Sequence, residues 1–279
     1  MGKFDGMLFC TDLDGTLLRN DGTISKENIE AIEYFKSEGG RFTFITGRMP
    51  FFADHVYNAI NPNAPFGCVN GGGLYDHIEQ KYIWTANMGE GVNELIRAID
   101  EQLPEVGIQV NTFYNTYFCK ENLTMKHFRE ITGLENLVCR YTEVTEPIGK
   151  IIFGSEDDDE ILEIERILRS HPRASYFDFV RSERTLFEIL PKGIGKGTAI
   201  TKLCEYLGID KNKTVATGDY NNDITMFRAA KLGIAVSNAC DDAKAEADYI
   251  TVSNEEHAIA RVISDIEGDA SYFFFEKKK

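Results

Sequence analysis

The sequence predicts an α/β protein with a doubly wound, Rossmann-like core of parallel strands and an α+β domain inserted into it. Two observations predict this class. Strand-like and helix-like segments alternate over residues 1–82 and again over 191–279, which is the rhythm of a parallel sheet with crossover helices. Between them, residues 83–190 carry aromatic-rich runs typical of antiparallel strands. We therefore expect a core of 1–82 and 191–279 and an inserted domain of 83–190.

The first part of the predicted core begins with a short apolar strand over residues 7–10. Ser25 is typical of a helix N-cap, and the apolar side chains that follow it continue until Gly39. The segment RFTFITGR predicts a second strand that runs into a loop, and Pro50 opens another helix. The segment GCVNGG then predicts a third strand that ends in a glycine-rich turn.

The inserted domain begins with a helical pattern that stops at Pro104. Four further segments predict antiparallel strands: VNTFYNTYFCK, GKIIFG, SYFDFV and TLFEIL. The segment EDDDEILEIERILRS lies among them. Its acidic start suggests a metal site, but acids in the first turn with Arg166 and Arg169 in the last are what a helix dipole favours. We therefore expect a helix there.

The alternation resumes after Pro191, with a helix that ends at Gly208. The strand KTVATGD, the helix NNDITMFRAAK and the strands LGIAV and DYITV follow. A last helix is expected to begin at Ser253, where Glu256 completes a capping box. These segments and the N-terminal ones are predicted to share one sheet.

The composition limits the kinds of partner. The chain has 279 residues and a formal net charge of -15, which argues against a general nucleic-acid binder or a binder of anionic membranes. It contains no apolar run long enough for a membrane span, and its start lacks the apolar stretch of a signal peptide. The six cysteines are scattered without a CxxC pair, which favours reduced thiols and a cytoplasmic location.

Two aspartates follow the first predicted strand. Asp12 and Asp14 are two residues apart, so an extended chain would aim both at one point. Two carboxylates that close need a cation, a proton or water between them. The alternative is a polar Asp-Gly turn without a ligand. A calcium loop of the EF-hand type is excluded, because Gly15 is the fourth residue from Asp12 and not the sixth.

Chemistry-bearing residues recur where other predicted strands end. Asp219 and Asp223, in GDYNND, follow a strand of the second part of the core. Lys196 precedes a helix, but Leu190 stands where a P-loop needs glycine, and a lone lysine is usually exposed to solvent. Because ligands bind beyond the carboxyl ends of parallel strands, we expect a carboxylate cluster with one lysine, suited to Mg²⁺ beside an anionic substrate.

Four segments together resemble a known family. In order along the chain, FCTDLDGTLL, FTFITGR, GIGKGTAI and GDYNND are similar to the four motifs of the haloacid dehalogenase-like (HAD) superfamily. The inserted domain resembles the C2B cap of its Cof-type phosphatases. The resemblance covers essentially the whole chain, and the turn at Asn70 resembles the family's Asn-Gly-Ala stretch.

The resemblance implies a role for each of these residues. Asp12 would be the nucleophile that forms an aspartyl-phosphate, and Asp14 the general acid and base. Asp12, the backbone carbonyl of Asp14, and Asp219 would hold Mg²⁺. The phosphoryl oxygens would be held by Thr46, the backbone amides of Leu13 and Gly47, Lys196 and Asn222. Asp223 would orient either Lys196 or a metal-bound water, and Arg48 would face the substrate or the cap.

The activity implied is hydrolysis of small phosphorylated metabolites such as sugar phosphates. A phosphomutase with the same cap class is the nearest alternative, because it differs only in whether water or a sugar hydroxyl receives the phosphoryl group. A non-catalytic sensor that accepts phosphate on Asp12 is the alternative from another class. Asp14 argues against the sensor, which has no need of a general acid.

Overall fold

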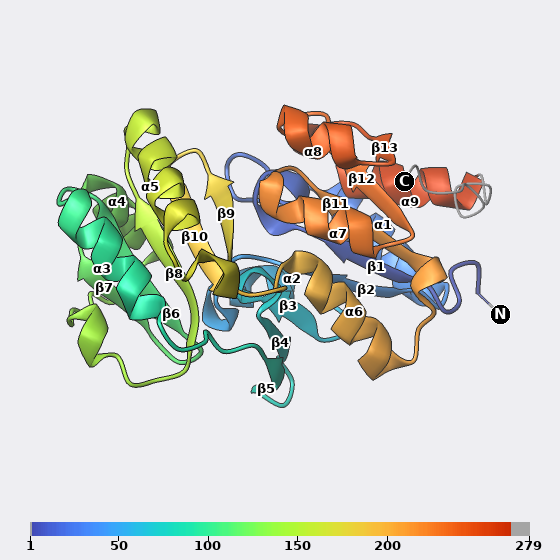
Figure 1. The fold of residues 1–279 in the computed structure, drawn as a ribbon. Helices are drawn as coiled ribbons and strands as arrows, with labels where there is room; N and C mark the ends of the chain where they lie inside the picture. The colour runs from blue at the N-terminus through green and yellow to red at the C-terminus, as the bar shows by residue number, and fades with distance from the viewer. Residues whose placement is uncertain (1, 269–279) are drawn as a thin grey trace. The chain divides into compact units, whose positions relative to one another are not determined.

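The structure is a computed structural model that describes residues 2–268, and it divides the chain into two compact units. The core unit takes the chain up to Trp84 and resumes at Gly195, whereas the cap unit is the continuous segment Thr85–Ile194. Figure 1 shows the elements of both. The chain thus leaves the core once and returns to it once.

The core unit contains a parallel five-stranded sheet in the order β13-β12-β11-β1-β2. Its strands are β1 (Leu8–Thr11), β2 (Arg41–Phe44), β11 (Thr214–Gly218), β12 (Leu232–Ala235) and β13 (Tyr249–Ile250). The first strand lies between partners from both parts of the chain, since Leu8 pairs with Arg41 on one side and Thr214 on the other. This strand order confirms that the two parts share one sheet.

Helices cover both faces of this sheet, as a doubly wound fold requires. They are α1 (Lys26–Ser37), α2 (Asp54–Ile60), α6 (Lys196–Leu207), α7 (Ile224–Ala229), α8 (Asp241–Glu246) and α9 (Ala258–Gly268). Side chains of α6 and α7 pack on Leu8 and Cys10 of β1. On the opposite face, Phe35 of α1 contacts the rings of Phe9 and Phe42 at centroid distances of 5.9 and 6.4 Å.

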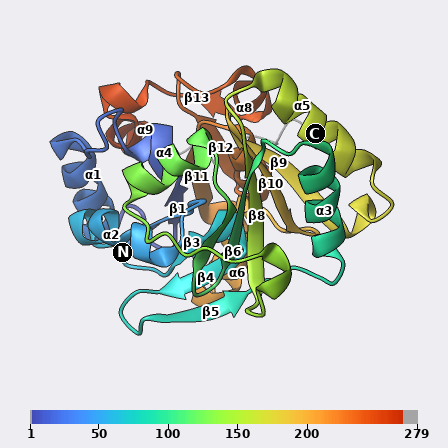
Figure 2. The same cartoon turned by 90° about the vertical axis from the view of Figure 1, so that its left-hand side faces the viewer.

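The predicted third strand forms and joins the core sheet through a parallel bridge, but it also pairs with a strand that was not predicted. Strand β3 (Phe66–Cys68) pairs antiparallel with β4 (Gly73–Asp76), which leads to β5 (Lys81–Thr85), and a single bridge from Ile45 to Gly67 joins it to the parallel sheet. Figure 2 shows β4 and β5 as a two-stranded ribbon. The cause is the turn between β3 and β4, where Val69, Asn70 and Gly71 have φ values of 54°, 52° and 83° and reverse the chain.

Helix starts agree with their capping signals at α1 but not at α2 or at the last helix. Pro50 opens a 3-10 turn, Pro50–Phe52, and α2 begins only at Asp54. The Ser25 side chain accepts a hydrogen bond from the backbone N–H of Asn28, which confirms the predicted N-cap of α1. The capping box of Ser253 and Glu256 also forms, but it starts a 3-10 turn, Asn254–Glu256. His257 then adopts a left-handed φ of 62°, so α9 begins only at Ala258 and the predicted start at Ser253 is wrong.

The cap unit is built on an antiparallel sheet in the order β7-β6-β8-β10-β9. Its strands are β6 (Gly107–Thr112), β7 (Thr116–Lys120), β8 (Ile148–Gly154), β9 (Phe177–Glu183) and β10 (Leu186–Pro191). Its helices are α3 (Val92–Gln102), α4 (Leu123–Thr132) and α5 (Asp158–Ser170). The acidic segment is therefore a helix, as predicted, and the Asp157 side chain caps it by accepting from the N–H of Asp159.

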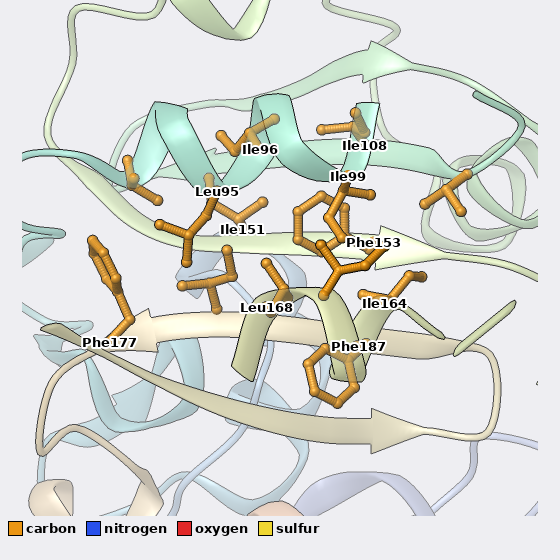
Figure 3. Packing of buried hydrophobic residues seen from close by; sticks show 14 of the residues in the cluster. Leu95, Ile96, Ile99, Ile108, Ile151, Phe153, Ile164, Leu168, Phe177 and Phe187 are labelled. Atoms are coloured by element: carbon orange, nitrogen blue, oxygen red, sulfur yellow. The ribbon is translucent and has the colours of Figure 1, made fainter. Parts of the chain in front are cut away.

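The hydrophobic core of the cap lies between one face of this sheet and the helices α3 and α5. Figure 3 shows their side chains directed toward those of β8, β9 and β10; the labelled residues are Leu95, Ile96, Ile99, Ile108, Ile151, Phe153, Ile164, Leu168, Phe177 and Phe187. Helix α4 packs on the other face, where Met125 contacts Phe118 and Ile152. Helix α4 is not among the predicted elements, although Asn122 and Gly133 are its N-cap and C-cap.

Two expectations from composition concern the described residues as a whole. All six cysteines are free thiols there, as their scattered positions predict. Over residues 2–268, the helices are too short or too polar to cross a membrane.

Candidate active site

Four polar residues lie at the carboxyl-terminal edge of the core sheet. Asp12 directly follows β1, and its backbone N–H donates to the carbonyl of Thr217 at 2.8 Å, which carries the β1–β11 pairing one residue further. Asp219 directly follows β11. The backbone N–H of Asn70 donates to the carbonyl of Thr46 at 3.1 Å, so the loop after β2 and the turn after β3 meet. Pairing in the sheet thus brings these residues to one edge.

Lys196 is the first residue of α6 and its side chain is only 1% exposed. Its Nζ lies 2.6 Å from Oδ1 of Asp12 and 2.6 Å from Oδ1 of Asp223. Burial alone would lower the pKa of this lysine, but the charges of Asp12 and Asp223 outweigh burial and raise the pKa above its ordinary value. The lysine is therefore a fixed positive charge, in contrast to the exposed lysine that its sequence context alone would suggest.

Asp223 is fully buried and braces the loop around it. Its Oδ1 accepts from Lys196, and its Oδ2 accepts from the backbone N–H groups of Asp219 and Tyr220 at 2.9 and 3.0 Å. Both oxygens are therefore engaged. Of the two roles that the sequence left open, this geometry corresponds to orienting Lys196.

Asp12, Asp219 and Asp223 form one carboxylate cluster, in which one ligand atom from each lies within 4.8 Å of the others. The turn after β1 lies close to Asp219, and this approach depends on Gly15, which has a φ of +75°. A Cβ at that position would lie 2.5 Å from Oδ2 of Asp219. The glycine of the DxDG stretch is thus required by both its conformation and its neighbour.

The single positive charge of Lys196 does not neutralise the three carboxylates of the cluster. Burial is the main cause that raises the pKa of Asp12 well above its ordinary value; the charge of Asp223 adds to it and Lys196 only partly offsets it. Burial and the charge of Asp223 likewise raise the pKa of Asp219 to about 7. Three carboxylates with one lysine suit a further cation, and carboxylate and carbonyl oxygens are the ligands that Mg²⁺ prefers. The residues present therefore fit a divalent metal ion.

Asp14 has a different environment from Asp12. Its side chain is 57% exposed and forms a two-point ion pair with Arg48, whose Nε donates to Oδ2 at 2.9 Å and whose Nη2 donates to Oδ1 at 2.5 Å. The two aspartates of the DxDG stretch therefore have different environments: Asp12 is buried beside Lys196, and Asp14 is exposed beside Arg48. Alternation along an extended strand does not describe them, because Asp14 and Gly15 belong to a tight turn, Leu13–Leu17.

The remaining predicted residues surround the cluster on the core unit. Asn222 donates from Nδ2 to Oδ1 of Asn70 at 3.1 Å. Thr46 is buried, and its hydroxyl oxygen accepts from the backbone N–H of Arg48. A Cβ at Gly47 would lie 3.1 Å from Oδ1 of Asn70, so the chain after Thr46 runs close to that amide. Leu13 is buried directly after Asp12.

Two contributors were absent from the sequence reading. The hydroxyl of Thr16 donates to Oδ1 of Asp219 at 3.1 Å, and Nδ2 of Asn238 donates to the carbonyl of Gly15 at 2.8 Å. Thr16 was detectable, because a residue that directly follows an Asp-Gly turn at a strand end lies beside the site. Asn238 had no such signal, since it comes from the loop after β12 and only the fold brings it near Gly15.

A family model for haloacid dehalogenase-like hydrolases matches residues 9–263. The chain belongs to this family. The resemblance inferred from the four segments is confirmed, and so is the α/β fold with an additional cap domain, because solved structures of the HAD family and its subclass IIB match it. The phosphatases among its relatives support the same enzyme class, and the protein is a HAD-family phosphatase.

Three similar proteins illustrate the match. The Bacillus subtilis protein YcsE, named 5-amino-6-(5-phospho-D-ribitylamino)uracil phosphatase, is 30% identical over 263 residues, which cover 93% of this chain and 95% of YcsE. A haloacid dehalogenase-like hydrolase from Bacteroides thetaiotaomicron has a TM-score of 0.78 at 23% identity, covering 93% of this chain and 99% of its own. The subclass IIB sugar phosphatase BT4131 has a TM-score of 0.80 at 22% identity, covering 93% and 98%.

Proposed function

We propose that this protein is a Mg²⁺-dependent phosphatase that hydrolyses small phosphorylated metabolites of the sugar-phosphate type through an aspartyl-phosphate on Asp12. The observation that carries the proposal is the buried contact of Lys196 with Asp12, beside Asp219, at the carboxyl-terminal edge of the sheet. A carboxylate held next to a permanent cation is suited to receive a phosphoryl group, and the neighbouring acids are suited to hold the further cation that offsets the negative charge of that group.

In the first step, one oxygen of Asp12 attacks phosphorus and the bond from phosphorus to the leaving oxygen breaks. Protonated Asp14 gives its proton to that oxygen, so the products are an alcohol and phosphorylated Asp12. The exposure of Asp14 supports this role, since a group that meets a variable leaving group has to be accessible. Asp12, in contrast, is buried among fixed neighbours.

In the second step, a water molecule attacks the same phosphorus atom and the carboxylate of Asp14 takes its proton. The bond from phosphorus to Asp12 breaks, which releases inorganic phosphate and restores both aspartates. Lys196 remains charged throughout and stabilises the phosphoryl oxygens together with Thr46, Asn222 and the backbone amides of Leu13 and Gly47. Asn70 orients Asn222 through the contact of their amides.

Asp12, Asp219 and the backbone carbonyl of Asp14 would hold the metal ion, which supplies the positive charge that lets a carboxylate and a phosphate approach each other. Asp223 is not assigned as a ligand, because both of its oxygens already accept hydrogen bonds from Lys196 and the loop backbone. Its role is to fix that loop and the direction of Lys196.

The substrate class rests on chemistry and on relatives. A net charge of -15 disfavours nucleic acid and anionic membranes as partners, which leaves small phosphorylated molecules. The similar proteins include a sugar phosphatase and a 5-amino-6-(5-phospho-D-ribitylamino)uracil phosphatase. We therefore propose phosphomonoesters of sugars and sugar alcohols, and free thiols at all six cysteines support a reducing, cytoplasmic setting.

The proposal is tested by measuring inorganic phosphate release from a panel of phosphomonoesters, with kcat/KM as the ranking. The panel includes p-nitrophenyl phosphate, hexose and pentose phosphates, sugar-alcohol phosphates and 5-amino-6-(5-phospho-D-ribitylamino)uracil. Activity should disappear in EDTA, return with Mg²⁺ and return poorly with Ca²⁺, which prefers more ligands and longer bonds.

Other outcomes would contradict the proposal in distinct ways. Interconversion of sugar phosphates without release of phosphate would identify a phosphomutase. A stable phosphoryl group on Asp12 without turnover would identify a sensor. Full activity in EDTA would remove the metal from the mechanism.

A further inference from the structure

Arg48 makes a fork-shaped contact with Asp14 at the edge of the site. Its Nε and Nη2 donate to the two different oxygens of the carboxyl group. Two parallel hydrogen bonds from one planar guanidinium fix both the direction and the rotation of a carboxyl group, which a single ion pair does not. Within the described part of the chain, this carboxyl group has Arg48 as its one hydrogen-bond partner.

The arginine is itself held in place. Its Nη1 donates to the backbone carbonyl of Phe52 at 3.2 Å, so all three nitrogens of the guanidinium are engaged. Its backbone is fixed as well, because its N–H donates to the hydroxyl oxygen of Thr46 and its carbonyl accepts from the N–H of Val69 at 3.0 Å. Arg48 therefore transmits the position of the loop after β2 to a side chain in the turn after β1.

We propose that Arg48 is a positioning residue that aims the carboxyl group of Asp14, and that it acts on the reaction through Asp14 and not by holding the phosphoryl group. The inference rests on the proposed function of Asp14 as general acid and base. It differs from both roles that the resemblance implied for Arg48, which were to face the substrate or the cap. The three hydrogen bonds hold the guanidinium in one orientation but leave one N–H on Nη1 and one on Nη2, so the experiment has to separate a positioning role from a direct phosphate contact.

The two steps of the reaction separate these roles. With p-nitrophenyl phosphate the leaving group departs without a proton, so transfer to Asp12 needs the phosphoryl contacts but not Asp14, whereas hydrolysis of the adduct needs Asp14 as base. A single turnover with enzyme in excess measures the first step as nitrophenolate release. Steady-state phosphate release measures the whole cycle.

Arg48→Ala should leave the single-turnover rate within about threefold of the wild type and lower kcat by roughly tenfold to a hundredfold, the scale of misplacing a catalytic group. KM should change little. Arg48→Lys should recover only part of kcat, because lysine cannot form the two-point fork. Arg41→Ala is the matched control, since Arg41 lies at the other end of β2, is exposed, and its guanidinium donates to the backbone carbonyl of Asn63.

A double variant completes the test. If Arg48 acts through Asp14, adding Arg48→Ala to Asp14→Asn should not slow decay of the phosphoryl adduct further, because the group being aimed no longer works. A fall in the single-turnover rate of Arg48→Ala beyond tenfold would overturn the inference and assign Arg48 to phosphate binding. Arg48→Lys with wild-type kcat would overturn it too.

Results that contradict the proposed function differ from results that contradict the positioning role of Arg48. A wild-type protein that hydrolyses no phosphomonoester, or an Asp12→Asn variant that still does, contradicts the proposed function itself. An active wild type with additive effects of Arg48→Ala and Asp14→Asn contradicts only the positioning role.

Discussion

Replacing Lys196 by methionine should destabilise the core unit through the two carboxylates that remain. Lys196 is 1% exposed and lies 2.6 Å from both Asp12 and Asp223, so methionine fills similar space but leaves two buried acids facing each other. Removing one partner from a buried ion pair costs about 3–5 kcal/mol. The cost is limited by protonation: giving one carboxyl a proton at pH 7, about three units above its ordinary pKa, requires ~4 kcal/mol.

This limit makes the loss depend on pH. In the variant one carboxyl group has a folded-state pKa above its unfolded value, so the folded state binds more protons and its stability falls as pH rises. Lys196 offsets part of the rise in the pKa of Asp12, so its removal should raise that pKa further and the difference from the wild type should be smaller at pH 5 than at pH 7. Its kcat/KM should fall by at least about a hundredfold, because a preorganised charge at the phosphoryl group is lost.

Urea unfolding in EDTA provides the measurement, and the chain contains a convenient reporter. Trp84 is the single tryptophan, and it packs against the hydrophobic cluster of the core unit, so its fluorescence follows the unit that contains Lys196. The double variant Lys196→Met with Asp223→Asn should recover more than half of the lost stability. Its asparagine removes one buried charge and keeps an oxygen for the N–H groups of Asp219 and Tyr220.

Two results would refute this reasoning about the buried lysine. One is a loss below about 1 kcal/mol at pH 7, which is too small for an uncompensated buried charge. The other is a double variant that is no more stable than Lys196→Met alone. Either result would mean that the two carboxylates are solvated or apart when the lysine is absent.

Three further predictions concern the aspartates and their turn. Asp12→Asn should abolish turnover of every substrate. With p-nitrophenyl phosphate, Asp14→Asn should release about one equivalent of nitrophenolate per site and then stall, and intact-mass analysis should find a hydroxylamine-labile adduct on Asp12. Near-native turnover of alkyl phosphates by Asp14→Asn would mean that the roles of the two aspartates have to be reassigned. Asp219→Asn should stabilise the metal-free protein at pH 8 by about 2 kcal/mol. Raising the pKa of this carboxyl group from 3.8 to about 7 costs the folded state ~4 kcal/mol when the group is ionised, and we expect about half of that to be recovered because the variant also weakens the hydrogen bond from Thr16. Since the folded pKa is the higher one, this gain should appear as pH rises from 4 to 7 and be absent at pH 4 in urea titrations; equal stability at both pH values would contradict it. Gly15→Ala should lower the Mg²⁺ affinity measured by calorimetry by about tenfold or more, because its Cβ would meet Asp219 at 2.5 Å; an unchanged affinity would show that the turn adjusts freely.

Sequence reasoning was most successful where a residue's place follows from the backbone pattern. Asp12 and Asp219 directly follow strands, and parallel pairing of β1 with β11 is enough to bring them to one edge. The environment of each side chain was harder to foresee. The burial of Lys196 depends on α6 starting against the sheet, and the pairing of Asp14 with Arg48 depends on the shape of two loops.

Misreadings of the fold have similar causes. The turn at Val69 and Asn70 reverses the chain through left-handed backbone conformations, which are rare for valine, so the antiparallel pairing of β3 with β4 was not predicted. Helix α4 was missed although its caps, Asn122 and Gly133, mark both of its ends. The interruption at His257 likewise left no apolar signature.

The position of β1 between β2 and β11 has a consequence for synthesis on the ribosome. Leu8 pairs with Thr214, 206 positions later, whereas the cap unit is continuous between Thr85 and Ile194. During translation the nascent chain therefore contains everything the cap needs before β1 has both of its partners. One edge of β1 remains unpaired while more than a hundred further residues are synthesised, and chaperones can bind it during this period. Lys196 and Asp219 join Asp12 only near the end of synthesis.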